Sequence, residues 1–266
     1  MNIGKKDYTF DDLIGIIKML RSEDGCPWDR VQTHDSVKMN LIEESYEAIE
    51  ALDSGDKDAF ADELGDVLLQ VVFHSCIGES DGTFTINDVL RHVCDKMISR
   101  HTHIFGTDKA ATPEEVLDTW DKNKQKEKGN TSITQDLKDV CSYLPALMRA
   151  QKVSKKSAKS GLDWENISDV LSQLKSEIKE LEDAIATGNT AYIEDELGDV
   201  IFTAVNVARF ADIKAETALN HSTDKFITRF EAVENAAEAL GKPLSEMTAD
   251  EQDKLWKEAK AQTDIV

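Results

Sequence analysis

The stretch DELGDVLLQVVFHSCI at residues 62–77 decides the fold, because it recurs as DELGDVIFTAVNVARF at residues 195–210. Each copy opens with carboxylates and continues as an almost wholly apolar run. This pattern predicts two helices, over 57–77 and 191–210, each buried on most of its circumference. No convincing stretch of alternating strand pattern occurs elsewhere, so the sequence predicts an all-α protein built of helix bundles.

The duplication extends along the whole chain with small insertions and deletions. At an offset of 133 residues, seven positions around the E-x-x-E and D-E-L-G-D motifs coincide without a gap. Further out, GCPWD at 25–29 parallels GLDWE at 161–165. We therefore expect two tandem helical domains, residues 1–125 and residues 137–266, joined by a polar linker over 126–136.

Composition and charge exclude several classes of partner. The chain of 266 residues carries 52 acidic and 31 basic residues, a formal net charge of −21, which would repel a nucleic-acid backbone. The N-terminus lacks the pattern of a signal peptide, and no run of eighteen apolar residues occurs. We expect a cytoplasmic protein that binds neither nucleic acid nor a membrane.

The acidic motifs predict a metal site in each half. Their carboxylates are spaced i, i+3, so each pair lies on one helix face at the rim of an apolar core, where unpaired negative charge is costly. A cation between the two helices removes that cost, and Gly65 and Gly198 suggest close approach of another helix or a ligand. The candidate ligands are Glu44, Glu47, Glu63 and Asp66 in the first half and Glu177, Glu180, Glu196 and Asp199 in the second.

The ligand type indicates which metal the site binds. Oxygen ligands without a thiolate or imidazole suit a hard ion, Mg²⁺ or alternatively Mn²⁺. A di-iron carboxylate site needs Glu-x-x-His on two helices, and no histidine follows these glutamates at that spacing. His101 and His103 are interpreted as ordinary loop histidines.

A carboxylate-held Mg²⁺ commonly binds phosphates, which points to phosphoryl or nucleotidyl chemistry. The chain contains neither a G-x-x-x-x-G-K-[ST] loop nor a G-x-G-x-x-G motif to hold them. Cations that recur beside a tryptophan in both halves are the candidate replacements, with the tryptophans available for base stacking. The candidate substrate-binding residues are Lys96, Arg100, Trp120 and Lys124 in the first half and Lys225, Arg229, Trp256 and Lys260 in the second.

With these motifs together, the chain resembles the two-domain form of the MazG family of nucleoside triphosphate pyrophosphohydrolases. The resemblance is carried over essentially the whole chain by GCPWDRVQTHDSVKMNLIEESYE, the two DELGD motifs, MRAQK, GLDWE, SEIKE, KFITRF and WKEAK. It implies an all-α bundle that forms a homodimer. It also implies Mg²⁺-dependent hydrolysis of nucleoside triphosphates, ATP among them, and of deoxynucleoside triphosphates, to the monophosphate and diphosphate with broad base tolerance.

The resemblance also assigns roles to residues. In the second half, Glu177, Glu180, Glu196 and Asp199 would hold Mg²⁺, while Lys225, Arg229, Trp256 and Lys260 would contact the nucleotide. Glu44 or Glu177 would orient the attacking water. One departure is Ser176, which stands where the family motif E-E-x-x-E has its first glutamate, whereas the first half keeps Glu43. We expect both sites to function and slightly favour the second, whose cations and tryptophan match the family more fully.

Two alternatives stay open from sequence alone. The acidic helices could form a regulatory or scaffolding module that binds a partner protein, with metal incidental. The chain could also belong to a neighbouring enzyme class, such as a hydrolase specific for dUTP or phosphoribosyl-ATP. Binding of a triphosphate only in the presence of Mg²⁺ separates an enzyme from a scaffold, and a substrate panel separates the enzymes.

Overall fold

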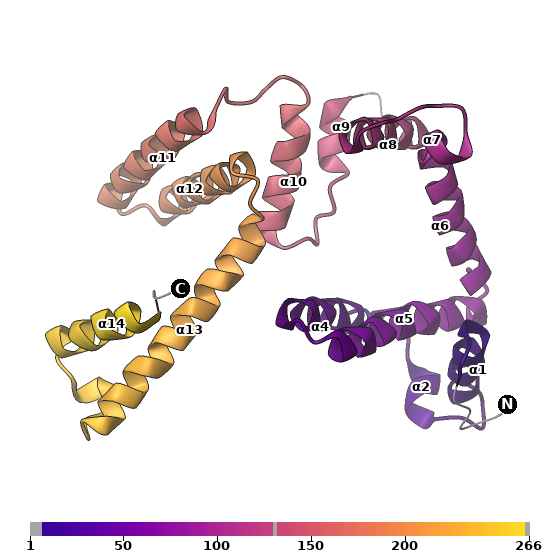
Figure 1. The fold of residues 1–266 in the computed structure, drawn as a ribbon, viewed down its shortest axis with the longest axis horizontal. Helices are drawn as coiled ribbons and strands as arrows, with labels where there is room; N and C mark the ends of the chain where they lie inside the picture. The colour runs from indigo at the N-terminus through magenta and orange to yellow at the C-terminus, as the bar shows by residue number, and fades with distance from the viewer. Residues whose placement is uncertain (1–6, 130–131, 264–266) are drawn as a thin grey trace. The chain divides into compact units, whose positions relative to one another are not determined.

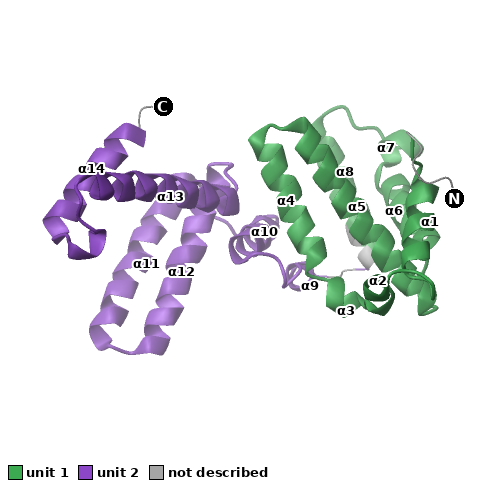
Figure 2. Cartoon of the chain, turned by 90° about the horizontal axis from the view of Figure 1, so that it is seen from below, with its two compact units in different colours: residues 1–128 green, residues 129–266 purple. Residues whose placement is uncertain are grey.

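The structure is a computed structural model that describes residues 7–129 and 132–263. Within these ranges every regular element is a helix, as Figure 1 shows. The predicted all-α class is therefore confirmed. The chain forms two compact units, Met1–Lys128 and Gly129–Val266, which Figure 2 colours separately.

The division between the units falls inside the stretch predicted as a linker, residues 126–136. Helix occupies much of that stretch, because α8 (Pro113–Lys128) enters it and α9 (Ile133–Lys138) begins within it. Residues 130–131 of the linker lie outside the described ranges, as do residues 1–6 and 264–266 of the predicted domains. The domain boundaries at 125 and 137 stay predictions.

Unit 1 is built around one long helical hairpin. Its elements are α1 (Phe10–Leu20), α2 (Pro27–Val31), α3 (His34–Val37), α4 (Asn40–Ser54), α5 (Lys57–Ser80), α6 (Ile86–Arg100), α7 (Thr102–Phe105) and α8. The first helix starts where Thr9 and Asp12 form a reciprocal capping box. The helix that carries the first acidic motif, α4, begins at Asn40, after the short helix α3 has ended at Val37.

The two acidic motifs face each other because of the turn between α4 and α5. Gly55 ends α4 with φ 77°, a left-handed conformation that glycine adopts without steric cost. Asp56 then accepts hydrogen bonds from the backbone N–H groups of Asp58 and Ala59 and caps α5. Two residues therefore reverse the chain, and the helices lie antiparallel side by side (Figure 1).

Unit 2 repeats this hairpin with α11 (Ile167–Thr187) and α12 (Thr190–Phe210), which lie side by side in both views (Figures 1 and 2). Gly188 takes the left-handed turn with φ 69°, and Asn189 caps α12. The other elements of the unit are α9, α10 (Ala146–Ala158), α13 (Ala215–Ala239), the 3-10 helix η1 (Leu244–Glu246) and α14 (Ala249–Thr263).

The main buried apolar clusters of the two units lie at different places relative to the hairpins. In unit 1, Ile17 of α1 packs with Val72, Phe73 and Ile77 of the C-terminal half of α5. In unit 2, the buried cluster instead joins α13 to α14, around Val233, Ala237, Leu255 and their neighbours. In unit 1 the acidic half of the hairpin therefore lies outside the buried cluster, and in unit 2 the cluster contains no residue of the hairpin.

The prediction that α5 and α12 are buried on most of their circumference is therefore wrong for the single chain. The C-terminal half of α5 is buried, but Leu64 and Leu68 beside the acidic motif are exposed. On α12, Ile201 and Phe202 are also exposed. Apolar composition indicated that these faces are covered, and the helices of the chain's own unit do not cover them.

The described helices were also compared with the requirements of a membrane span. None of them combines the length and the apolar character needed to cross a bilayer.

Candidate metal and nucleotide site

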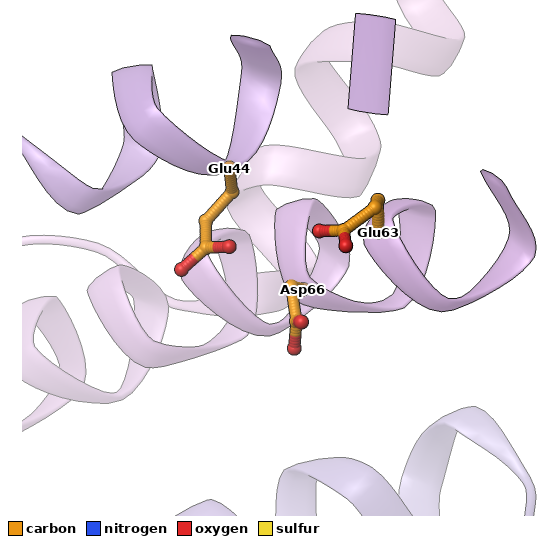
Figure 3. Close-up of side chains that lie close together, drawn as sticks. All are labelled: Glu44, Glu63 and Asp66. Carbon is orange, nitrogen blue, oxygen red and sulfur yellow. The ribbon is translucent and has the colours of Figure 1, made fainter. Parts of the chain in front are cut away.

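Three carboxylates from two helices meet in unit 1. Glu44 of α4 points across the hairpin toward Glu63 and Asp66 of α5, as Figure 3 shows. One oxygen from each of the three lies within 4.8 Å of the others. The i, i+3 spacing places the two α5 side chains on one face, and the short turn at Gly55 brings Glu44 opposite them.

The carboxylates of this cluster disfavour one another's charge. Burial raises the pKa of Glu44 most, followed by repulsion from Asp66 and then from Glu47, while the hydrogen bond from Gln70 acts in the opposite direction. Partial removal from water likewise raises the pKa of Glu63, with repulsion from Glu47 and Asp66 next. A bound cation would offset this repulsion and stabilise the charged forms of the carboxylates.

Unit 2 contains the equivalent cluster. Glu177 of α11 meets Glu196 and Asp199 of α12, again with oxygens within 4.8 Å of one another. Glu196 is 8% exposed, and its burial, followed by repulsion from Glu180 and Asp199, raises its pKa. Gln173 donates a hydrogen bond of 2.7 Å from Nε2 to Glu177 Oε1, one turn earlier on the same helix.

The fourth predicted ligand of each site lies at the edge of the cluster. Glu47 and Glu180 are outside the sets of three close oxygens, although each raises the pKa of the glutamate opposite it. Ser176 Oγ donates to Glu180 Oε1 at 3.1 Å, so the residue that departs from the motif holds this carboxylate. In unit 1 the corresponding position, Glu43, is exposed.

Two arginines that the sequence did not single out hold the segments that contain Trp28 and Trp164. Arg21 donates from Nη1 to the backbone oxygen of Asp29 at 2.7 Å, and its guanidinium lies over the Phe73 ring at 5.0 Å. Arg209 of α12 holds the carboxylate of Asp163 with both Nη groups, at 2.9 Å from Nη1. An isolated arginine carries no pattern, so only the fold reveals this role.

The predicted substrate residues of unit 1 lie along α6 and α8. Arg100 pairs with Glu127 at 2.7 Å and stacks over Trp120 at 5.3 Å. The edge of His101 lies against the same tryptophan at 5.0 Å between ring centroids. Lys96 is exposed on α6, and Lys124 is half-buried on α8. These contacts join α6 to α8 and do not place the group beside Glu44, so its role in substrate binding stays a prediction.

The equivalent residues of unit 2 lie on α13 and α14. Arg229 donates from Nε to Thr263 Oγ1 at 2.9 Å, and Lys225 and Lys260 are exposed. Trp256 packs against Phe226 at 5.2 Å between ring centroids and lines a cavity of about 570 Å³ between the two helices. These contacts do not place the set beside the carboxylates of α11 and α12, so its role in substrate binding stays a prediction.

Gly65 and Gly198 led us to expect close approach of another helix or a ligand, and no helix of the chain makes that approach. A Cβ atom added at either position would meet nothing within 4 Å outside its own helix backbone. Both glycines therefore present open surface beside the carboxylates, which leaves room for a ligand or a second molecule.

A protein-family model matches the sequence around both carboxylate clusters. The family model of the MazG nucleotide pyrophosphohydrolase domain matches residues 32–105 and again residues 165–234. The chain belongs to the MazG family. Each matched region contains one complete carboxylate hairpin, so both copies of the MazG domain bring the same cluster together.

Several relatives match nearly the whole chain. The nucleoside triphosphate pyrophosphohydrolase/pyrophosphatase MazG of Thermotoga maritima is 39% identical over 251 residues, which span 94% of this chain and 95% of the relative. The nucleoside triphosphate pyrophosphohydrolase of Escherichia coli K12 is 37% identical over 95% of this chain and 97% of its own length. YabN of Bacillus subtilis is 44% identical, but this chain spans only 52% of it.

Proposed function

We propose that this chain hydrolyses nucleoside and deoxynucleoside triphosphates to the monophosphate and diphosphate. The observation that carries the proposal is the facing of three carboxylates across each hairpin, with oxygens within 4.8 Å and with raised pKa values at Glu44, Glu63 and Glu196. The relatives that match nearly the whole chain are named nucleoside triphosphate pyrophosphohydrolases, and these names supply the reaction class.

We propose Mg²⁺ as the cofactor, with Mn²⁺ as a substitute. The close ligand atoms are all carboxylate oxygens, which is the donor set of a hard divalent ion. Glu44, Glu63 and Asp66 would hold it in unit 1, and Glu177, Glu196 and Asp199 in unit 2, with Glu47 and Glu180 at the edge. When bound, Mg²⁺ neutralises phosphate charge and keeps coordination positions open for the substrate.

The chain's own residues would then activate water. A carboxylate that faces the triphosphate would accept a proton from a water molecule. The water oxygen would attack the α-phosphorus, and the bond from that phosphorus to the leaving diphosphate would break. We assign this role to Glu44, whose carboxylate Gln70 Nε2 orients from 3.3 Å. Glu177, held by Gln173, is the counterpart in unit 2.

Broad base tolerance follows if the phosphates provide most of the recognition. In unit 2 the diphosphate would be neutralised by Lys225, Arg229 and Lys260. Trp256 would stack on the base. The cavity that it lines is mainly apolar and presents few polar groups that could distinguish one base from another. Lys96, Arg100, Trp120 and Lys124 would serve in unit 1.

We further propose that the molecule acts as a homodimer. Ile42, Tyr46 and Ile49 form an exposed stripe at i, i+4, i+7 on α4, and Leu64 and Leu68 continue it on α5. The carboxylate hairpin of unit 1 is thus an amphipathic helix pair with an exposed apolar side. A second copy of the same hairpin has the matching shape and composition, because a two-fold interface pairs identical surfaces.

The test is product analysis with several triphosphates and Mg²⁺ on the wild-type chain, Glu63→Gln, Glu196→Gln and the double variant. Diphosphate release should fall in each single variant in proportion to that site's share and vanish in the double. Asp53→Asn on α4 and Glu194→Gln on α12, which are exposed carboxylates outside the clusters, are matched controls. Undiminished diphosphate release by the double variant, or orthophosphate as the product, would overturn the proposal.

A further inference from the structure

Glu127, in the last turn of α8, occupies an anion-binding position that is formed by the end of α6. Its Oε2 accepts hydrogen bonds from Arg100 Nε at 2.9 Å and from Arg100 Nη2 at 2.7 Å. Its Oε1 accepts a hydrogen bond from Ser99 Oγ at 2.5 Å. Donors from α6 therefore hold both carboxylate oxygens. A phosphate group can bind in the same way, because its oxygens accept from the same donors.

The guanidinium of Arg100 is also held by a contact that does not involve Glu127. It lies over the Trp120 ring at 5.3 Å from the ring centroid, and the arginine side chain is only 12% exposed. A guanidinium fixed in this way loses little further freedom when it binds an anion. Hydrogen bonds from Arg100 and then from Ser99 lower the pKa of Glu127, and the charge of Lys96 lowers it further. The position is therefore electropositive.

The carboxylate of Glu127 lies where another anion can displace it. Its side chain is 34% exposed, and α8 ends one residue later, at Lys128. The helix dipole disfavours a negative charge in the last turn of a helix, so the backbone of α8 does not stabilise the ionised side chain. A partly exposed ion pair also adds little to the free energy of unfolding. The bond to Arg100 therefore restrains Glu127 weakly enough for a more highly charged anion to compete.

The second half of the chain carries no carboxylate at the corresponding position. An offset of 136 residues aligns Trp120 with Trp256. The same offset aligns Glu127 with Thr263. Thr263 Oγ1 accepts a hydrogen bond from Arg229 Nε at 2.9 Å, so a neutral hydroxyl stands where unit 1 has a carboxylate. An internal anion at this position is thus a feature of unit 1.

We propose that Glu127 competes with the substrate for Arg100 and Ser99 in unit 1. A phosphate group of the triphosphate binds these donors only after it has displaced the Glu127 carboxylate into solvent, and the ion pair forms again when the product leaves. Glu127 therefore lowers the affinity of unit 1 for triphosphate. The inference rests on the function proposed above and on the predicted role of Arg100, and it adds a residue that sets the affinity of one of the two sites.

The test measures triphosphate binding by unit 1 in the full chain. The background carries Glu196→Gln and Asp199→Asn, which remove two of the proposed metal ligands of the second site. A nonhydrolysable nucleoside triphosphate and inorganic tripolyphosphate are titrated calorimetrically with Mg²⁺ present. Glu127→Gln should bind both ligands about threefold to tenfold more tightly, because neither then has to displace a charged hydrogen-bond acceptor from Arg100.

Three further variants assign the effect to the ion pair. Arg100→Gln should weaken binding, and the addition of Glu127→Gln to it should restore nothing, because the competition requires Arg100. Asp118→Asn removes an exposed charge from the same helix and should leave both affinities unchanged, since salt screens distant surface charges. Glu127→Thr introduces the residue of unit 2 and should also bind more tightly than the background, and it decides the question if Glu127→Gln does not fold.

Four results would overturn the inference: unchanged or weaker binding by Glu127→Gln, the same gain in Asp118→Asn, the same gain without Arg100, or no triphosphate binding by the background and its variants. Unfolding of both Glu127 variants would do so as well, since the ion pair would then be a structural contact between α6 and α8. Each result is compatible with diphosphate release by the wild-type chain, so the inference can fail while the proposed function stands. Absence of diphosphate release from the wild type would instead refute the function, whatever the titrations give.

Discussion

Asn206 is predicted to be the most sensitive polar residue of unit 2. It lies in the middle of α12 with 0% exposure, and its Oδ1 accepts hydrogen bonds from Ser154 Oγ on α10 and from Arg209 Nε, the latter at 3.1 Å. Its Nδ2 donates to the backbone oxygen of Phe202 at 3.0 Å. Through Arg209 this amide also supports the bond to Asp163 that holds the GLDWE segment.

Leucine at position 206 would fill most of the volume of Asn206 but would leave two hydrogen-bond donors without their acceptor. Ser154 is 3% exposed, so its hydroxyl would lose its bond to Asn206 where water has little access, and Arg209 Nε would lose its acceptor. A stranded buried donor costs about 1–3 kcal/mol, so Asn206→Leu should cost about 2–4 kcal/mol. Ser154→Ala removes one bond and leaves Asn206 paired with Arg209, and it should cost only about 0.5–1.5 kcal/mol.

The assay is urea unfolding followed by circular dichroism, with the transition of unit 2 analysed for each variant. The double variant Ser154→Ala, Asn206→Leu should be destabilised by less than the sum of the single variants, because the serine hydroxyl is no longer there to be stranded. The reasoning fails if Asn206→Leu costs no more than Ser154→Ala, or if the double variant is simply additive.

Three other predictions follow from the carboxylates, the glycines and the histidines. Mg²⁺ at a hundredfold excess over its Kd should raise the Tm of each unit by about 5–10 °C. Asp66→Asn should remove the rise in unit 1, and Asp199→Asn should remove it in unit 2. Equal responses in the wild type and both variants would contradict both metal sites. Gly198→Ala should stabilise metal-free α12 by up to about 1 kcal/mol, since no atom of the chain opposes a Cβ there, and a simultaneous loss of diphosphate release would show that substrate or a second copy approaches at this point. Burial, followed by repulsion from His34, lowers the pKa of His74 in the folded protein. The unfolded chain therefore binds this proton more readily than the folded chain. Neutral His74 contributes its full share to the free energy of unfolding above about pH 6.5, and that share is lost as the pH falls below it. The urea midpoint of unit 1 should therefore drop less between pH 7.5 and 5.5 in His74→Phe than in the wild type, and identical drops would refute the linkage.

Sequence periodicity was sufficient for the two helices that carry the DELGD motifs and for six of the eight predicted ligands, whereas Glu47 and Glu180 lie outside the sets of close oxygens. The i, i+3 spacing of Glu63 and Asp66 fixes their common face whatever the rest of the fold, because 3.6 residues make one helical turn. The duplication at an offset of 133 residues then predicts a second site without further information. The turn residues at Gly55 and Gly188 follow local chemistry as well, because a left-handed position favours glycine.

Only the tertiary structure decided which side chains from different helices meet. Gln70 and Asn206 stand in runs that look apolar, and their buried bonds to Glu44 and Ser154 appear only when α4 and α10 are placed opposite them. The sequence also left open whether a helix or a ligand approaches the glycines of the ELGD motifs, and the structure shows that no helix of the chain does. A sequence thus determined the helix faces and their charges, because these depend on neighbours along the chain. The arginine bonds that hold the Trp28 segment and Glu127 depend on contacts between distant segments, which periodicity does not encode.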